Sequence, residues 1–173
     1  MPLQICRALF LGLLGLVLQH PVWAGPARTP EQHQKVDDFV AFPLGMGTSQ
    51  TLGRMRSFDK VLSEKSRMVP NAYRQGAQDE VRTFEYDGLV LQVLFVGRSP
   101  SNGLLWETDI TKPRWAMKHG LKVGSTVAEV QKELGEPDER APGQLKYCGD
   151  RACGVFYLDA NRVTRAVFTN APE

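Results

Sequence analysis

The stretch LKVGSTVAEVQKELGEP, residues 121–137, decides the fold. Thr126 and Glu129 have the spacing of a capping box, in which each side chain accepts a hydrogen bond from the other residue's backbone N–H. Gly135 suits the left-handed position that ends a helix, and Pro137 blocks its continuation. The apolar residues between these signals share one helical face: Val127, Val130 and Leu134. The stretch therefore predicts a short helix with one buried face.

Downstream of this helix, alternating apolar and polar residues predict an antiparallel meander. The expected strands are 145–148, 154–158 and 163–169. Asn161, in the turn DANR between the last two strands, tolerates a positive φ. Residues 119–170 therefore read as a helix followed by three strands.

Upstream, the sequence repeats this plan. LGMGT at 44–48 matches LKVGS at 121–125 as Leu-x-apolar-Gly-hydroxyl. The residues over about 51–66 are expected to be helical, and a break in their apolar pattern at Ser57 suggests two short helices. Asp87-Gly88 is a strong two-residue hairpin signal, and the strands expected around it are 81–86, 89–96 and 104–111.

The repeated order predicts an α+β fold of two tandem helix(-helix)-three-strand repeats, with an antiparallel sheet and helices packed on one side. The repeats would span 41–111 and 119–170, joined by an inter-repeat segment at 112–118. The strand at 89–96 is apolar on both faces, which is unusual for an antiparallel strand with one wet face. Two interpretations stay open: the rest of the chain buries both faces, or one face meets a partner.

The N-terminal residues indicate export. Residues 1–24 combine Arg7, a short apolar run and Ala24 at a cleavage position, which is typical of a secretory signal peptide. The apolar run is shorter than the roughly 20 residues of a membrane-spanning helix. We expect cleavage after Ala24, location in the periplasm and no stable membrane anchor. Residues 25–40 are expected to be a polar N-terminal arm, in which Thr29-Pro30 would start a short helix.

Two cysteines remain after such a cleavage, Cys148 and Cys153. In an oxidising compartment they predict one structural disulfide across the end of a hairpin. A redox-active pair more often has the spacing C-x-x-C, and a zinc site needs two further ligands. We therefore expect neither a metal nor another cofactor.

Composition and motifs argue against nucleic-acid binding and catalysis. Lys plus Arg number 21 and Asp plus Glu 19, a formal charge of only +2, whereas nucleic-acid binders carry a clear basic excess. The sequence holds no Gly-x-Ser-x-Gly, His-Glu-x-x-His or P-loop motif. A Ser/His/Asp set around His119 stays open. Carboxylates two residues apart on a strand are interpreted as a solvated face: Glu85 with Asp87, and Glu107 with Asp109. We predict that the protein is not an enzyme.

The helix at 121–137 and the strands after it resemble a known family of small envelope domains. This family comprises outer-membrane-assembly lipoproteins of the BamE/SmpA type and β-lactamase inhibitor proteins. The matching positions are Gly124, Ser125, Glu129, Val130, Leu134, Gly135, Pro137 and Tyr147. The resemblance implies two αα-βββ-like units in one sheet and a protein-binding role without a catalytic centre. Two departures are the missing lipid-bearing Cys and the second repeat, which bring the chain closer to the inhibitor arrangement.

Large side chains with polar neighbours are the candidate contact residues: Tyr73, Trp106, Arg114 and Trp115. Aromatic residues and Arg dominate binding hot spots. Trp106 shares its expected strand face with Leu104 and Ile110, so a core position is the competing interpretation. Trp115 is the stronger surface candidate, and its alternative role is to hold the two repeats together.

Together these observations predict an exported, non-catalytic protein-binding module that inhibits or masks an envelope protein or hydrolase. One alternative is an accessory factor in outer-membrane or cell-envelope assembly. Another is a small periplasmic hydrolase or small-ligand carrier. A deep apolar pocket would favour the latter class, and a broad sheet face with exposed aromatics would favour protein binding.

Overall fold

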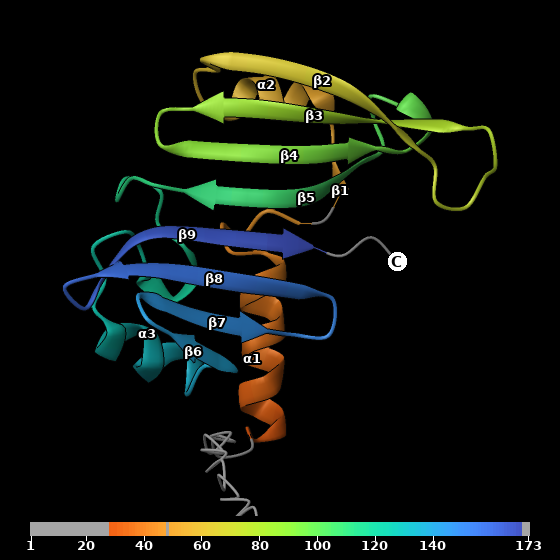
Figure 1. Cartoon of the computed structure of the whole chain (residues 1–173). Coiled ribbons are helices and arrows are strands. Elements are labelled where there is room, and N and C mark those ends of the chain that lie inside the picture. The colour runs from red at the N-terminus through yellow and green to blue at the C-terminus, as the bar shows by residue number, and fades with distance from the viewer. Residues whose placement is uncertain (1–27, 48, 171–173) are drawn as a thin grey trace, which may run out of the picture.

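A computed structural model describes residues 28–47 and 49–170, so the expected signal peptide at 1–24 lies outside the described residues. The described part is α+β, with one nine-stranded antiparallel sheet and three α-helices (Figure 1). The sheet order is β2-β3-β4-β5-β9-β8-β7-β6, with β1 paired to β5. The predicted fold class is confirmed at this level.

Two groups of strands build this sheet, and each follows a helix. The first part contains α1 (Pro30–Ala41), β1 (Ser49–Gln50), α2 (Leu52–Phe58), β2 (Ser63–Pro70), β3 (Gln78–Tyr86), β4 (Leu89–Phe95), the 3-10 turn η1 (Val96–Arg98) and β5 (Gly103–Ile110). The second part contains the 3-10 turn η2 (Lys118–Gly120), α3 (Val127–Leu134), β6 (Glu139–Ala141), β7 (Gln144–Cys148), β8 (Ala152–Asp159) and β9 (Arg162–Asn170). The groups meet where β5 pairs with β9.

The local signals of α3 work as predicted. The Thr126 hydroxyl accepts from the Glu129 N–H at 3.2 Å, and the Glu129 carboxylate accepts from the Thr126 N–H at 2.6 Å. Gly135 follows the helix at a φ of 77°, which a residue with a side chain rarely adopts. Val130 and Leu134 are buried. The helix is confirmed because every signal lies within a few residues of it.

The expected helical stretch over 51–66 is wrong at its end. Helix α2 stops at Phe58, and residues from Ser63 onward form β2. Ser63 pairs with Glu85, and the ladder runs to Pro70 opposite Gln78. The next strand, β3, supplies these partners across a loop, so the pairing overrides a weak local helix preference. Apart from the two-residue β1, which pairs with β5, each group has four strands, β2–β5 and β6–β9, where three were expected.

The segment expected to be a polar arm contains α1, a helix of the core. Thr29 caps it, as the sequence suggests, with Gln32 completing a capping box. The helix buries Val36, Phe39 and Val40 against β7, β8 and β9, strands more than a hundred residues further along the chain. Its apolar stripe thus belongs to the second group of strands.

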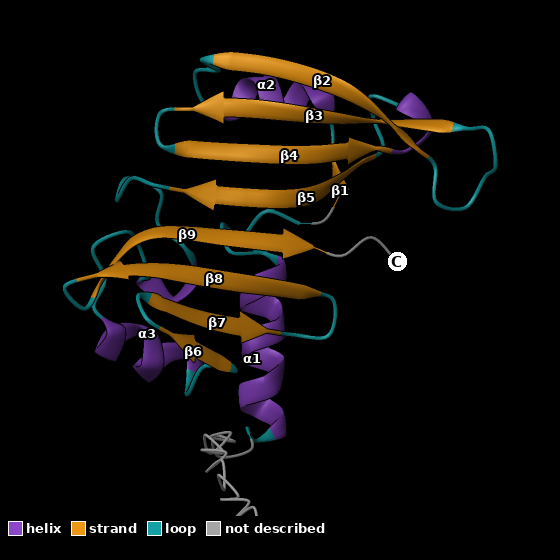
Figure 2. Ribbon diagram, in the orientation of Figure 1, coloured by secondary structure: helices purple, strands orange, loops and turns teal. Residues whose placement is uncertain are grey.

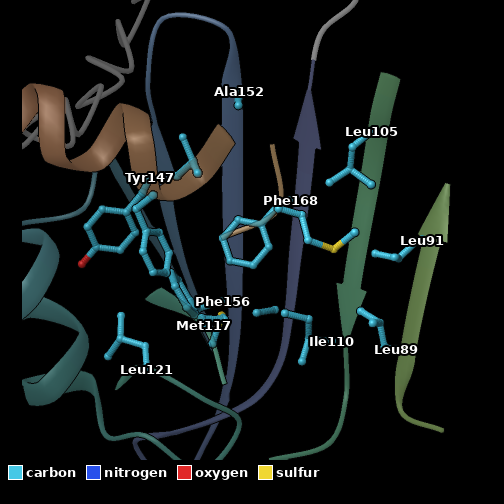
Figure 3. Packing of buried hydrophobic residues seen from close by; sticks show 14 of the residues in the cluster. Leu89, Leu91, Leu105, Ile110, Met117, Leu121, Tyr147, Ala152, Phe156 and Phe168 are labelled. Atoms are coloured by element: carbon cyan, nitrogen blue, oxygen red, sulfur yellow. The ribbon is translucent and has the colours of Figure 1, made fainter. Parts of the chain in front are cut away.

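The apolar core runs without a break across both groups of strands. Figure 3 shows Phe156 and Phe168 beside Ile110, Leu89 and Leu91, so side chains from β8 and β9 continue those of β4 and β5. Phe156 and Phe168 meet edge to face, with ring centroids 5.8 Å apart. One sheet and one continuous core therefore hold the described residues together.

Candidate functional site

The sheet has one face under helices and one without them. Figure 2 shows all three α-helices behind the strands, and the strands in front carry none. Register assigns side chains to these faces, because residues directly opposite in an antiparallel ladder point the same way. Phe84, Leu91 and Thr108 form one cross-strand row and are fully buried on the helix side. Their chain neighbours therefore lie on the other side, called the open face below.

Two rows of side chains define the open face. The first crosses β2 to β5 through Arg67, Val81, Leu94 and Leu104. The second crosses the whole sheet, from β2 to β6, through Ser63, Glu85, Val90, Asp109, Val167, Val155, Lys146 and Glu139. Apolar residues thus alternate with charges over a surface that no helix covers.

Trp106 lies on this open face because of a β-bulge. Between β4 and β5 the register shifts: Val93 pairs with Leu105, but Gln92 pairs with Glu107. The bulge places Trp106 outside the regular alternation. The expected common face of Leu104, Trp106 and Ile110 is therefore wrong, because Ile110 is buried on the helix side and Leu104 is 38% exposed on the open face.

Arg67 and Trp106 meet across the open face. The Arg67 guanidinium lies 5.7 Å from the centroid of the Trp106 ring, a cation–π contact. Arg67 is on β2 and Trp106 on β5, so this contact passes over the two strands between them. Val81 and Leu94 lie beneath it and are 0% and 9% exposed, although no helix covers them. The contact covers the second face of β4 at Leu94, whereas Val90 on the same face is only half-buried.

Arg165 forms a second cluster at the junction of the two strand groups. Its guanidinium donates to both carboxylate oxygens of Asp109, at 2.9 and 2.8 Å, and this contact raises the pKa of Arg165. It also lies 5.3 Å from the centroid of the Tyr157 ring. The three side chains come from β9, β5 and β8, so they join both groups on the open face.

The remaining carboxylates that the sequence singled out also have partners. Glu107 accepts a hydrogen bond from Gln92 at 2.9 Å, and Glu85 pairs with Lys65 at 2.7 Å. Asp87 belongs to the hairpin turn, where Lys112 above all, and Arg114, lower the pKa of its carboxyl. Each carboxylate is held by a neighbouring polar or cationic group.

Trp115 and Arg114 pack together away from the open face. The Trp115 ring stacks on Phe58 with centroids 5.6 Å apart, and its indole N–H donates to the Asp87 carbonyl at 2.8 Å. The Arg114 guanidinium lies 4.8 Å from the Trp115 ring and reaches Asp59 at 2.5 Å. Trp115 is therefore a half-buried side chain that fastens the segment after β5 onto α2.

Tyr73 stands apart from the other three candidates. It lies in the loop between β2 and β3 and is 72% exposed. Its backbone N–H donates to the Asn71 side chain at 2.9 Å, which fixes the turn. The structure thus brings Arg114 and Trp115 together and places Trp106 and Tyr73 elsewhere.

Sequence reasoning missed the two arginines that organise the open face. Arg67 lies just beyond the stretch expected to be helical, and Arg165 was seen only as part of a strand. Neither belongs to a motif, and their partners Trp106 and Asp109 become neighbours only through the strand order. An Arg in a strand next to residues of alternating polarity was the one available signal.

Two hollows of the described surface are shallow and lined mostly by polar residues. One, of about 470 Å³, is lined by Arg28, Pro30, His33, Gln34, Asp138 and Cys148. Arg28 there already donates to the Cys148 and Glu136 carbonyls and to Asp138. The other, of about 390 Å³, lies between the start of α3 and the β8–β9 turn. Neither has the apolar lining expected of a small-molecule site.

The remaining sequence predictions concern the cysteines and ligands. The Cys148–Cys153 disulfide is confirmed. His119 is exposed at a φ of 57° and stacks on Phe39 with centroids 6.0 Å apart. Within residues 28–47 and 49–170, no group of three His, Cys, Asp or Glu side chains has the geometry to hold a metal ion. No helix of that part is long and apolar enough to cross a membrane.

Comparison with known proteins gives little. No protein-family model matches the chain, and no curated protein sequence matches it. A similar solved structure is the uncharacterized protein YfeY from Escherichia coli, with a TM-score of 0.40 and 12% sequence identity. That similarity covers 75% of this chain and 96% of YfeY. At this level of similarity it supports no conclusion about function.

Proposed function

We propose that this protein is an exported, non-catalytic protein-binding module of the periplasm, and that it binds its partner through the open face at Trp106. The observation that carries the proposal is the Arg67–Trp106 contact on a sheet face without helices. Aromatic side chains and Arg supply most of the binding energy in protein interfaces. A pair already held in place loses little side-chain entropy when a partner arrives.

The surroundings of Trp106 support this role. Leu104, two residues earlier, is 38% exposed, and Val90 and Val167 are half-buried on the same face. Charged pairs are interspersed with these apolar side chains: Asp109, which Arg165 holds, lies between Val90 and Val167 in the same cross-strand row. Charged groups among apolar side chains give a protein interface specificity for a complementary partner.

We further propose that the two strand groups are copies of one ancestral unit, as the resemblance to BamE-type domains and inhibitor proteins implies. Each group is a helix followed by four strands, and the two groups meet through their last strands, β5 and β9. Such a doubled sheet offers twice the open face of one unit. The partner would be another envelope protein, masked as an inhibitor masks a hydrolase. An accessory role in envelope assembly is the alternative, and the identity of the partner distinguishes the two.

The test is capture of partners from native envelope extract by the purified, oxidised protein, at about 0.15 M salt to screen loose surface electrostatics. One partner at near-equal stoichiometry, purified and re-bound, is the expected result. Trp106→Ala should weaken that binding at least about tenfold, the effect of a hot-spot residue. Trp115→Phe, which keeps an aromatic ring on Phe58, is the matched control and should bind normally. Failure to capture any protein, or equal binding by Trp106→Ala, would contradict the proposal.

A further inference from the structure

The outer side of β2 is a free strand edge. Among residues 28–47 and 49–170, β2 is the terminal strand of the sheet and pairs only with β3. The Asn71 N–H donates to the Ala77 carbonyl at 3.0 Å, next to the pair Pro70–Gln78. This bond shows which residues of β2 direct their backbone N–H and C=O groups toward β3. Paired residues alternate between hydrogen-bonded and non-hydrogen-bonded positions. The outward-pointing N–H and C=O groups are therefore those of Glu64, Ser66 and Met68.

The position of Pro70 is consistent with this assignment of outward-pointing residues. It occupies an outward position, where its missing N–H removes no bond to β3. Six of the eight strand residues, Glu64 to Met68 and Pro70, are exposed, so the edge is accessible along most of its length.

We propose that this edge binds an extended, acidic segment of a partner protein by strand addition. The main chain of that segment would pair with Glu64, Ser66 and Met68, and its carboxylates would meet Lys65 and Arg67. This inference shares with the proposed function the premise that the partner is a protein and the side chain of Arg67. Strand addition obtains affinity from main-chain hydrogen bonds and specificity from alternate side chains.

The charge of the edge selects the chemistry of the segment. Lys65 and Arg67 are two residues apart and point to the open face, and the Lys65 side chain is 70% exposed. Arg67 has no anionic partner among the residues that the structure describes; its recorded contact is the Trp106 ring. Carboxylates two residues apart on an added strand would lie directly opposite both cations, where opposite charges stabilise cross-strand pairs.

An exposed apolar side chain lies near each end of β2. Met68 points to the helix side and is 43% exposed, and Leu62, just before the strand, is 60% exposed. A segment that alternates acidic and apolar residues would place carboxylates on the open face and apolar side chains at Met68.

A second copy of the chain fits this edge poorly. When two β2 strands pair so that both open faces stay on the same side, the registers of greatest overlap are centred on Ser66 or Arg67. These set Lys65 opposite Arg67, or Arg67 opposite Arg67. Like charges directly opposite one another are destabilising, and Lys on an edge strand is a known guard against self-association. The same charges attract an acidic strand.

The test uses a peptide of alternating Glu and Val, as long as β2 and blocked at both ends, with the full protein at about 0.15 M salt, where weak surface attraction is screened. The expected result is saturable binding and slower amide hydrogen exchange at Glu64, Ser66 and Met68. Peptides of alternating Lys and Val, and of the same Glu and Val residues in two blocks, should not bind.

Two pairs of variants separate charge from main-chain pairing. Lys65→Gln/Arg67→Gln should weaken binding at least about fivefold, the effect of losing two exposed cross-strand charge pairs. Lys122→Gln/Lys132→Gln changes the net charge equally on exposed residues of the second group and should bind normally. Ser66→Pro removes an outward N–H without touching the β3 ladder and should abolish binding, whereas Ser66→Ala should retain it.

Three results would overturn the edge proposal. The first is no binding of the alternating Glu/Val peptide at millimolar concentration. The second is equally strong binding of the peptide with Glu and Val in two blocks, or of heparin. The third is slower amide hydrogen exchange confined to residues other than Glu64, Ser66 and Met68. A captured partner that tolerates Ser66→Pro but not Trp106→Ala would overturn the edge proposal alone. Peptide binding to β2 without any captured partner would overturn the proposed function alone.

Discussion

Arg165 on β9 holds Asp109 on β5 through two parallel hydrogen bonds of 2.9 and 2.8 Å. The ladder between these strands is short, running from Glu107 opposite Thr169 to Ile110 opposite Ala166. Arg165 directly precedes Ala166 in β9, one residue outside the ladder, and its side chain adds a contact to Asp109 beside the backbone hydrogen bonds. A planar guanidinium on a carboxylate fixes geometry as well as charge.

We expect this pair to couple the two strand groups energetically. A double-mutant cycle of Arg165→Gln and Asp109→Asn, measured by urea unfolding, should give a coupling of about 0.5–1 kcal/mol, because the Arg side chain remains 47% exposed. The exposed Arg140–Glu136 pair is the control and should give less. Equal coupling in both pairs would show that the junction gains nothing from Arg165.

Trp115 should matter for stability, whereas Tyr73 should not. Trp115→Ala removes the ring that stacks on Phe58 and contacts Tyr86, and should lower the free energy of unfolding by about 2–3 kcal/mol. Tyr73 is 72% exposed, so Tyr73→Ala should change it by less than about 0.5 kcal/mol. Urea midpoints compare the two variants. A neutral Trp115→Ala would return Trp115 to the surface candidates.

The turn closed by the disulfide packs tightly against α1. A Cβ atom added at Gly149 would lie 2.6 Å from the Asp37 Cα, and the Asp150 N–H donates to the Asp37 carboxylate at 2.9 Å. Gly149→Ala should therefore destabilise the protein by about 1–3 kcal/mol through overpacking. Gly47→Ala, where the added Cβ meets nothing within 4 Å, is the control. Thermal unfolding of both variants decides whether the turn supports the helix.

Alkaline pH should unfold the protein through its buried tyrosines. Burial, and to a lesser extent Asp59 and Glu64, raises the pKa of Tyr86 from 10.0 to about 12. Tyr86 therefore keeps its hydroxyl proton to a higher pH in the folded state than in the unfolded state. This stabilisation is complete below pH 10 and is lost as pH rises through about 12.

Tyr86→Phe should weaken this alkaline loss. At neutral pH the same change costs about 1 kcal/mol, since the Tyr86 hydroxyl donates to the Met55 carbonyl. Some alkaline loss should persist, because burial also raises the pKa of Tyr147. Urea midpoints measured across the alkaline range test the prediction; parallel curves for variant and parent would contradict it.

The elements predicted from the sequence are those whose signals are local. The capping box at Thr126 and the hairpin dipeptide Asp87-Gly88 both act within a few residues of themselves. β2 was taken in part for helix because its partner, β3, is a strand beyond a loop. An edge strand that is exposed along most of its length has no buried face. Its sequence therefore lacks the alternation of apolar and polar residues that would have indicated a strand.

The candidate site was predicted less completely than the fold. Trp106 was named as a candidate contact residue, and it shares its face with Leu104 but not with Ile110, because a single bulged residue reverses the alternation of all that follows. Arg67 and Arg165 carry only a weak sequence signal, since each acquires its role from a residue on a strand that only the sheet order brings near. Strand order and bulges are global properties, and periodicity reports neither of them.

The position of α1 has a consequence for the order in which the protein acquires structure. A chain emerges from its N-terminus, so Val36, Phe39 and Val40 are present long before the strands that bury them. The surface that the helix covers, formed by β7, β8 and β9, is complete only when β9, ending at Asn170, has emerged as well. Contacts this distant in sequence form slowly. Completion of the core therefore depends on the last strand, and a chain truncated before β9 would leave its first helix exposed to proteases and chaperones.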